Sequence, residues 1–200
     1  MTSPLWPHIT PGIPDEHFER LPGIPMSKRE VRVLMISQLH LRRDSILWDL
    51  GAGTGTIPVE VGLLCPQGQV VAVERDEDVA QLIRRNCQRF QVSNVQVVEG
   101  SAPDCLAHLS PAPTHIIVEG GRPIQTLLEA AWNYLPPQGR MVATTANLEG
   151  LYGISECFAA LQARHVEIVQ AAVNRLEKRG NQQVFAALDP MFILSGEKWE

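Results

Sequence analysis

Short apolar runs alternate with amphipathic segments along most of this chain. The apolar runs are rich in Val, Ile and Leu and have the length of buried strands; they cover residues 45–51, 69–76, 95–100, 115–121 and 139–146. Other segments repeat their apolar residues every three or four positions, as on one face of a helix; they cover residues 57–65, 78–90, 124–135 and 151–164. This alternation predicts a doubly wound, Rossmann-like α/β domain, with a mostly parallel sheet covered by helices on both faces.

The tail follows a different pattern. Two strand candidates, at roughly residues 166–174 and 183–195, follow one another without a helix between them. The second is interrupted at Pro190, because proline cannot donate a hydrogen bond to a neighbouring strand. Two consecutive strands after a βαβ series predict an antiparallel hairpin at the C-terminal edge of the sheet.

The N-terminal segment, residues 1–26, is rich in proline, with prolines at positions 4, 7, 11, 14, 22 and 25. A helix does not tolerate this spacing, so we expect an extended arm or lid. Ser27 and Glu30 have the spacing of a capping box, which predicts that Ser27 caps a helix over residues 27–41. The chain thus divides into an arm, residues 1–26, and one domain, residues 27–200.

Composition narrows the class of protein. The net charge is −5, whereas phosphate neutralisation needs a basic face, so we expect no nucleic-acid partner. No apolar run approaches the roughly 20 residues that span a bilayer, and the N-terminus lacks the layout of a signal peptide. We therefore expect no membrane association and a cytoplasmic location. The four cysteines form no C-x-x-C pair and the histidines have no metal-ligand spacing, so we expect free thiols and no metal site.

A glycine-rich segment, DLGAGTG at 49–55, directly follows the first apolar run of the α/β series. Its glycines allow a tight turn and let a ligand approach the backbone closely. Thr56 excludes the G-x-G-x-x-G fingerprint of dinucleotide-binding proteins, and the Gly-Lys-Ser/Thr of a P-loop is absent. The D-x-G-x-G-x-G form resembles instead the first motif of class I methyltransferases, which use S-adenosylmethionine. The expected cofactor contacts in this loop are Gly51, Ala52, Gly53, Thr54 and Gly55.

Later strand ends offer further polar groups. Glu74 ends the second run about 20 residues after the glycine loop, where an acid can accept hydrogen bonds from both ribose hydroxyl groups. The third run ends in Glu-Gly-Ser101-Ala102, where a backbone amide or the Ser101 hydroxyl can contact adenine. The fourth run ends at 119–122, where enzymes of this architecture present groups to a substrate, although a plain turn is an equally good interpretation.

Longer motifs resemble one family in particular. They are GIPDEHFERLPGIPMSKREVRVLMISQL, DLGAGTGTIPVEVG, EGSAPDCL, EAAWNYLPPQGRMV and ANLEG, and the likeness extends from Gly12 to about Gly196. The glycine loop is common to class I methyltransferases, but the G-I-P-D-E-x-F opening followed by M-S-K-R-E is far more selective. The chain resembles the CbiT family, the decarboxylating precorrin-6B carbon-15 methyltransferases of cobalamin biosynthesis.

The resemblance implies a reaction and partners. S-adenosylmethionine would methylate carbon 15 of a tetrapyrrole, a precorrin or cobalt-precorrin, and the acetate on carbon 12 would lose carbon dioxide. The electron-rich ring carbon can itself be the nucleophile, so no catalytic residue is assigned. The implied cofactor contacts are Ser27, the loop at 51–55, Glu74, Ser101 and Ala102. The family also implies a homotetramer, and the enzyme that methylates carbon 5 is a candidate partner.

A substrate with many carboxylates needs basic groups at the cleft. Arg122 and at least one of Arg175, Lys178 and Arg179 are expected to supply them, although the last three could equally lie in a solvated loop. The candidate substrate contacts are Glu119, Gly120, Gly121, Arg122 and Arg175. Relatives often read G-G-S-G-G in the region where this chain has Glu119–Pro123. Two alternatives remain open: an RNA methyltransferase of the same fold, and a non-catalytic subunit that retains the fold.

Overall fold

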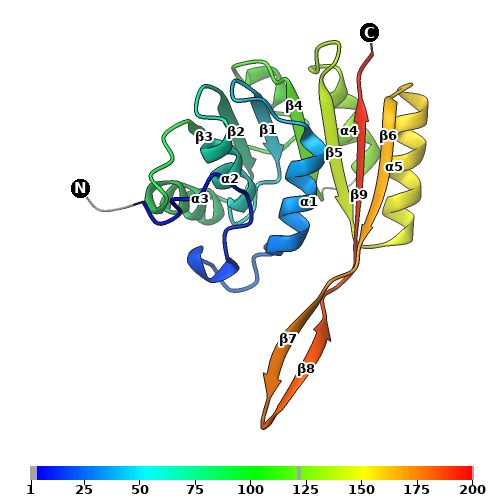
Figure 1. Ribbon diagram of the computed structural model, residues 1–200. Coiled ribbons are helices and arrows are strands. Elements are labelled where there is room, and N and C mark those ends of the chain that lie inside the picture. The colour runs from blue at the N-terminus through cyan, green and yellow to red at the C-terminus, as the bar shows by residue number, and fades with distance from the viewer. Residues whose placement is uncertain (1–3, 121–122, 200) are drawn as a thin grey trace.

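The computed structural model of the chain describes residues 4–120 and 123–199. Its main element is a seven-stranded sheet with the strand order β3-β2-β1-β4-β5-β9-β6 (Figure 1). These strands are β1 (Ile46–Leu50), β2 (Gln69–Glu74), β3 (Val95–Glu99), β4 (His115–Glu119), β5 (Arg140–Thr145), β6 (Arg164–Ala171) and β9 (Met191–Glu197). Strands β1 to β5 are parallel, and β9 is antiparallel to both β5 and β6. The predicted doubly wound sheet with an antiparallel C-terminal edge is confirmed.

Helices cover both faces of this sheet. They are α1 (Arg29–Leu39), α2 (Thr56–Leu64), α3 (Glu77–Arg89), α4 (Ile124–Trp132) and α5 (Leu148–Ala160). Helices α4 and α5 bury their apolar residues on one face of the sheet, while α1, α2 and α3 cover the other. Neither face is left open, which explains why the central strands read as continuous apolar runs. Within the described ranges, no helix is long and apolar enough to cross a membrane.

Strand β1 shows how alternation assigns side chains to the two layers. Trp48 and Leu50 belong to the core under α4 and α5, and Leu47 belongs to the core under α1 and α2. Because successive side chains of a strand point to opposite faces, Asp49 lies on the same face as Leu47. A carboxyl group is thus inserted into an otherwise apolar layer.

The N-terminal arm is extended, with one short 3-10 turn at Asp15–His17, and it is fastened to the domain by Arg32. The Arg32 side chain is fully buried and donates to Glu60 (2.8 Å) and Asp15 (2.7 Å), as well as to the backbone carbonyls of Ile13 and Ser27. A buried guanidinium stabilises a fold only when its donors are satisfied in this way. The arm is therefore part of the folded domain.

The predicted capping box at Ser27 is wrong. Helix α1 begins at Arg29 with Lys28 as its N-cap, and no side chain caps it. The Ser27 hydroxyl group instead donates a hydrogen bond to Glu119, which is 92 residues away in the sequence. A long-range partner has thus displaced the local one.

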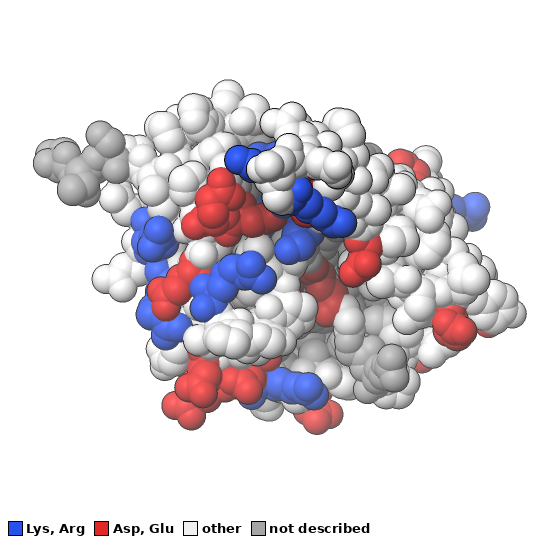
Figure 2. All heavy atoms as spheres, turned by 90° about the horizontal axis from the view of Figure 1, so that it is seen from below, with Lys and Arg blue, Asp and Glu red and all other residues white. Residues whose placement is uncertain are grey.

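The tail forms more than an edge hairpin. Strands β7 (Asn174–Arg179) and β8 (Gln182–Ala187) pair with each other in a separate two-stranded ribbon between β6 and β9. The ribbon projects away from the sheet, at the end where the parallel strands finish (Figure 1). The predicted interruption at Pro190 is confirmed, because it separates β8 from β9. Seen from below, this end of the molecule carries intermingled acidic and basic side chains (Figure 2).

Candidate active site

The glycine loop follows β1 and leads into α2. Gly51, Gly53 and Gly55 have φ angles of +92°, +51° and +82°, in a region that residues other than glycine rarely adopt. A Cβ atom at Gly51 would lie 3.0 Å from the carbonyl oxygen of Glu119, and one at Gly55 would lie 2.9 Å from Ile83 Cγ2. The glycines therefore let the loop pass close to β4 and α3.

Glu74 lies at the end of β2, beside this loop. Its Oε2 accepts a hydrogen bond from the backbone amide of Gly53 (3.1 Å), and its Oε1 accepts from the amides of Arg75 (2.9 Å) and Asp76 (3.2 Å). These bonds fix the carboxylate at the rim of the loop, as the spacing in the sequence predicted. Ala102 and Ser101 lie nearby at the end of β3 and line the same cavity as Glu74.

Two cavities meet at the loop. The first, of about 620 Å³, has Glu74, Ser101 and Ala102 in its wall. The second, of about 740 Å³, lies between the arm, β5 and α5 and includes Ser27 and Asn147. Both cavities are lined by Pro25, Gly51, Gly53, Glu119 and Gly120. A ligand in one cavity would therefore adjoin a ligand in the other along this shared wall.

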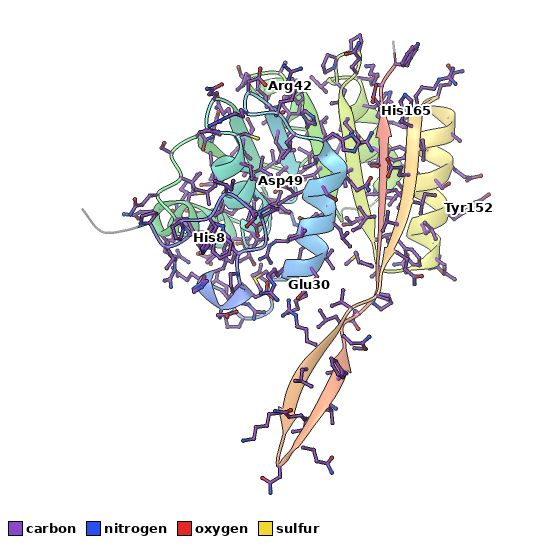
Figure 3. All side chains as sticks on the ribbon, viewed as in Figure 1. His8, Glu30, Arg42, Asp49, Tyr152 and His165 are labelled. Atoms are coloured by element: carbon purple, nitrogen blue, oxygen red, sulfur yellow. The ribbon has the colours of Figure 1, made fainter. Side chains whose placement is uncertain are left out.

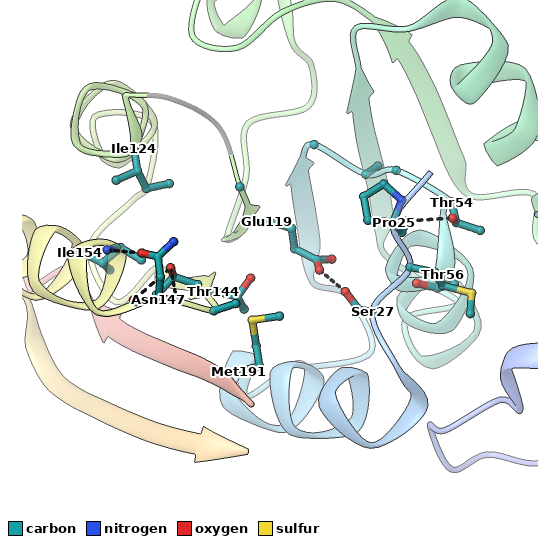
Figure 4. A pocket seen from close by; sticks show the side chains of 18 of the residues that line it. Pro25, Ser27, Thr54, Thr56, Glu119, Ile124, Thr144, Asn147, Ile154 and Met191 are labelled. Carbon is teal, nitrogen blue, oxygen red and sulfur yellow. Dashed lines mark hydrogen bonds between the residues drawn. The ribbon is translucent and has the colours of Figure 1, made fainter. Parts of the chain in front are cut away.

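Glu119 occupies the centre of the shared wall. Its carboxyl group points to Ser27 of the arm, with Thr144, Asn147 and Ile154 on the other side of the second cavity (Figure 4). Burial raises the pKa of Glu119 above its ordinary value, although the Ser27 hydrogen bond and the Arg32 charge act in the opposite direction. The sequence indicated Glu119 as a candidate substrate contact at the end of a strand, and its pairing with Ser27 was not foreseen.

Asp49 was missed by the sequence analysis as a site residue. It is fully buried, and neither carboxyl oxygen has a hydrogen-bond partner. The Asp49 side chain lies in the interior of the domain (Figure 3). In the sheet register it lies between Ala72 and Ile117, so that Glu74 and Glu119 follow two positions later on the flanking strands and the same face. Burial, and then the charges of Glu119 and Glu74, raise the pKa of Asp49 well above its ordinary range. The available signal was an acid placed inside an apolar strand just before the loop.

This group of three carboxyls is not a metal centre. Among the residues that the structure describes, no three His, Cys, Asp or Glu side chains are arranged to hold a metal ion. The group instead places three acidic side chains on one sheet face beside the glycine loop.

The second cavity is closed by elements that the sequence analysis had not connected with it. Pro25 and Met26 of the arm line one side, and the Thr54 hydroxyl group fixes the arm there by donating to the Pro25 carbonyl (3.1 Å). Asn147 and Glu149 line the other side at the start of α5, where the Asn147 side chain accepts from the Gly150 amide (2.7 Å) and caps the helix. These residues are brought together by the fold, so no spacing in the sequence indicated them.

The basic substrate candidates are placed differently from the expectation. Arg175, at the base of the ribbon, is bound to the carboxylates of Asp15 (3.0 Å) and Glu30. The Arg175 hydrogen bond lowers the pKa of Glu30 to about 2. The guanidinium thus binds carboxylates of its own chain. Gly121 and Arg122 lie outside the described residues.

The sheet order, the glycine loop after β1 and the acid at the end of β2 together define a class I methyltransferase. The chain matches the family described as "Precorrin methyltransferase domain" over residues 20–198. It belongs to this family.

Curated relatives and solved structures agree with this assignment. A Pyrobaculum calidifontis protein named "Probable cobalt-precorrin-6B C(15)-methyltransferase (decarboxylating)" is 39% identical over 192 residues, 95% of this chain and 97% of that protein. A Salmonella typhimurium relative with the name "Cobalt-precorrin-6B C(15)-methyltransferase (decarboxylating)" is 34% identical over 187 residues, 93% and 96% of the two chains. The crystal structure of precorrin-6y C5,15-methyltransferase from Geobacter metallireducens superposes with a TM-score of 0.87 and 29% identity, covering 96% and 98% of the chains. The resemblance seen in the sequence is confirmed.

Proposed function

We propose that the protein is an S-adenosylmethionine-dependent methyltransferase that methylates carbon 15 of precorrin-6B or cobalt-precorrin-6B and removes one carboxylate as carbon dioxide. The names of the relatives support the reaction. The observation that carries it is the pair of cavities that share the wall formed by Gly51, Gly53 and Glu119. A methyl donor in the first cavity would face an acceptor in the second, so the methyl group could pass directly from one to the other without a covalent intermediate on a side chain.

The residues of the first cavity fit S-adenosylmethionine. Glu74 has the position of a ribose-binding acid, and Ser101 with Ala102 would face the adenine. Asp49 supplies a further test of fit, because its buried carboxyl lies directly before the loop without a hydrogen-bond partner, and a polar group of a ligand there would provide one. Ser27, Ala52, Thr54 and Gly55 complete the proposed set around the loop.

When bound, S-adenosylmethionine supplies an electrophilic methyl group on a sulfonium. The chain's own residues hold the two reactants in line and keep water away from them, and this positioning is the main requirement of such a displacement. Pro25 and Met26 form the wall that separates the reaction from solvent on the arm side. The electron-rich carbon of the macrocycle needs no activating nucleophile from the protein.

The second cavity is the proposed substrate site, with Glu119 and Gly120 at its inner end. Its described lining contains the carboxyl groups of Glu119 and Glu149 and no Lys or Arg. We therefore keep Arg122 as a proposed substrate contact. We do not assign Arg175 to the substrate, because its guanidinium is bound to Asp15 and Glu30.

Assembly is part of the proposal. The two-stranded ribbon has no core of its own and exposes Phe185 and Leu176 (74% and 55% exposed). Exposed apolar groups on such a ribbon favour contact with other copies of the chain, and we propose a homotetramer. We also propose that it acts in the cytoplasm, where its free thiols stay reduced. The enzyme that methylates carbon 5 of the precursor is a proposed partner, and no nucleic-acid or membrane partner is proposed.

The test is incubation of the protein with S-adenosylmethionine and either precorrin-6B or cobalt-precorrin-6B, followed by mass spectrometry. The expected product has gained one methyl group and lost carbon dioxide. A protein that binds S-adenosylmethionine but methylates RNA instead would overturn the proposal in favour of an RNA methyltransferase. A protein that binds no S-adenosylmethionine in calorimetry would be a non-catalytic subunit.

A further inference from the structure

Glu119 is the one ionisable side chain that the two cavities have in common among the described residues. It ends β4, so the strand fixes its backbone, and the Ser27 hydroxyl group fixes its carboxyl group from the arm (Figure 4). A group at this position touches both the reacting end of the donor and the adjoining face of the acceptor. Glu119 is thus positioned for the chemical step as well as for binding.

Burial raises the pKa of Glu119 and favours its neutral carboxyl, whereas the Ser27 hydrogen bond and the Arg32 charge act in the opposite direction. Asp49 of β1 is fully buried on the same sheet face, and its oxygens have no partner. Glu74 of β2 is engaged by three backbone amides. The nearby cation, Arg32 of α1, is bound to Asp15 of the arm and Glu60 of α2.

Asp49 is fully buried and Glu119 is half-buried on the same sheet face, and the charge of Glu119 raises the pKa of Asp49, so the two carboxyls do not readily ionise together. Burial raises the pKa of both groups, in agreement with this arrangement. Of the two, only Glu119 lines the cavities. Glu119 is therefore the carboxyl group of the pair that can give a proton to a ligand.

The proposed reaction requires such a proton. When carbon dioxide leaves, the bond between the side-chain methylene carbon and the carboxylate breaks, and its electron pair stays on the methylene carbon and the conjugated ring. That carbon must take up one proton to become a methyl group. The ring receives the donor's methyl group as a cation and gives up one proton, so the two transfers balance over one turnover.

We infer that Glu119 is a catalytic acid, whose carboxyl group delivers the proton to the carbon from which the carboxylate departs. The carboxylate that remains is reprotonated by the proton that the methylated ring gives up. This inference rests on the proposed function. It adds a catalytic residue to a site in which the sequence indicated none.

The test compares Glu119→Gln with Glu99→Gln. Glutamine can still accept the Ser27 hydrogen bond, so the fold is preserved, but it has no carboxyl proton to give. Glu99 is the matched control because it ends β3, another parallel strand of the same sheet, also precedes a glycine, and binds Arg84 on the surface outside both cavities. Glu119→Asp serves as the second variant, since it retains a carboxyl group at a shorter reach.

Formation of the decarboxylated, methylated product should fall roughly 100- to 10,000-fold in Glu119→Gln, the usual contribution of a general acid. Glu119→Asp should recover part of this loss, and Glu99→Gln should match the wild type. The Kd for S-adenosylmethionine, measured by calorimetry, should be unchanged in all three variants. The wild-type rate should fall as the pH rises and the acid ionises, and Glu119→Gln should lose this dependence.

A wild-type rate in Glu119→Gln would overturn the inference. So would a loss of cofactor affinity as large as the loss of rate, because Glu119 would then be a binding residue. If wild type and Glu99→Gln both bind S-adenosylmethionine but neither converts a precorrin, the proposed function has failed and the inference with it.

Discussion

Replacing Asp49 by asparagine should make the protein more stable in the absence of its cofactor and should lower its affinity for the cofactor. The carboxyl group is fully buried, has no hydrogen-bond partner, and lies on the same face as Glu74 and Glu119. At neutral pH the unfolded chain carries an ionised aspartate, so folding must either protonate the group or bury its charge. Asparagine has nearly the same shape and avoids both costs.

The size of each effect follows from this environment. An unsatisfied buried polar group costs about 1–3 kcal/mol, which for a chain of this length corresponds to an increase in Tm of about 2–12 °C. A ligand that supplies the missing partner of Asp49 would gain about 1–3 kcal/mol from it, so Kd for S-adenosylmethionine should rise roughly fivefold to 150-fold when this partner is lost. The two effects have opposite signs, which a merely disruptive substitution would not produce.

Thermal unfolding with and without S-adenosylmethionine, together with calorimetry, measures both effects. Folding raises the pKa of Asp49 from its ordinary value of 3.8. Below pH 3.8 the carboxyl is protonated in both the folded and the unfolded protein and does not oppose folding, whereas at higher pH the unfolded chain ionises and the free energy of unfolding falls. The gain in Asp49→Asn should therefore shrink when unfolding is measured below pH 3.8. Asp44→Asn, at a side chain that is 65% exposed, is the control and should change neither quantity. A variant less stable than wild type without cofactor, or one that binds cofactor as tightly, would refute the role given to Asp49.

Three further predictions concern other parts of the molecule. Glu74→Ala should weaken S-adenosylmethionine binding by roughly 1–3 kcal/mol in calorimetry, and unchanged affinity in the folded variant would remove Glu74 from the site. Burial lowers the pKa of His115 from 6.5 to about 4, so the free energy of unfolding should fall by about 3 kcal/mol as the pH drops through this window. Measured by urea unfolding, the stability of His115→Asn should not fall over this pH range. The same pH dependence in the variant and the wild type would contradict the role given to His115. Arg32→Ala should lower the free energy of unfolding by about 3–5 kcal/mol, because it leaves Glu60 buried and unpaired. Arg175 is partly exposed, so Arg175→Ala should lower it by at most about 1 kcal/mol. Similar losses for the two variants in urea unfolding would show that burial does not distinguish these ion pairs.

The parts of the fold that depend on local periodicity were predictable from the sequence. The apolar runs became the parallel strands, and the glycine loop with Glu74 assembled at the ends of β1 and β2 as expected. The reason is that strand order in such a sheet brings these two ends together whatever the side chains elsewhere. The cofactor role of these residues stays a prediction.

The rest of the site depends on contacts between distant residues. Ser27 followed the capping-box pattern, yet its hydroxyl group bonds to Glu119 of β4. Arg175 is basic and near the tail, but the fold places two carboxylates beside it. Asp49 looked like the first letter of a motif, and only the register of β1 with its neighbours shows that two further acids follow on the flanking strands, on the same face. No pattern within a short window contains this information.

The arm also determines when the site comes into existence as the chain folds. It is synthesised before the rest of the domain, and its partners come much later: Glu60 binds Gly12, Asn86 binds Glu19, Glu119 binds Ser27 and Arg175 binds Asp15. Contacts of such sequence separation are slow to form, because a long loop must close before any of them is made. The wall that Pro25, Met26 and Ser27 supply can therefore be completed only after these distant partners have been synthesised and have folded, so the active site depends on the tail of the domain as well as on its beginning.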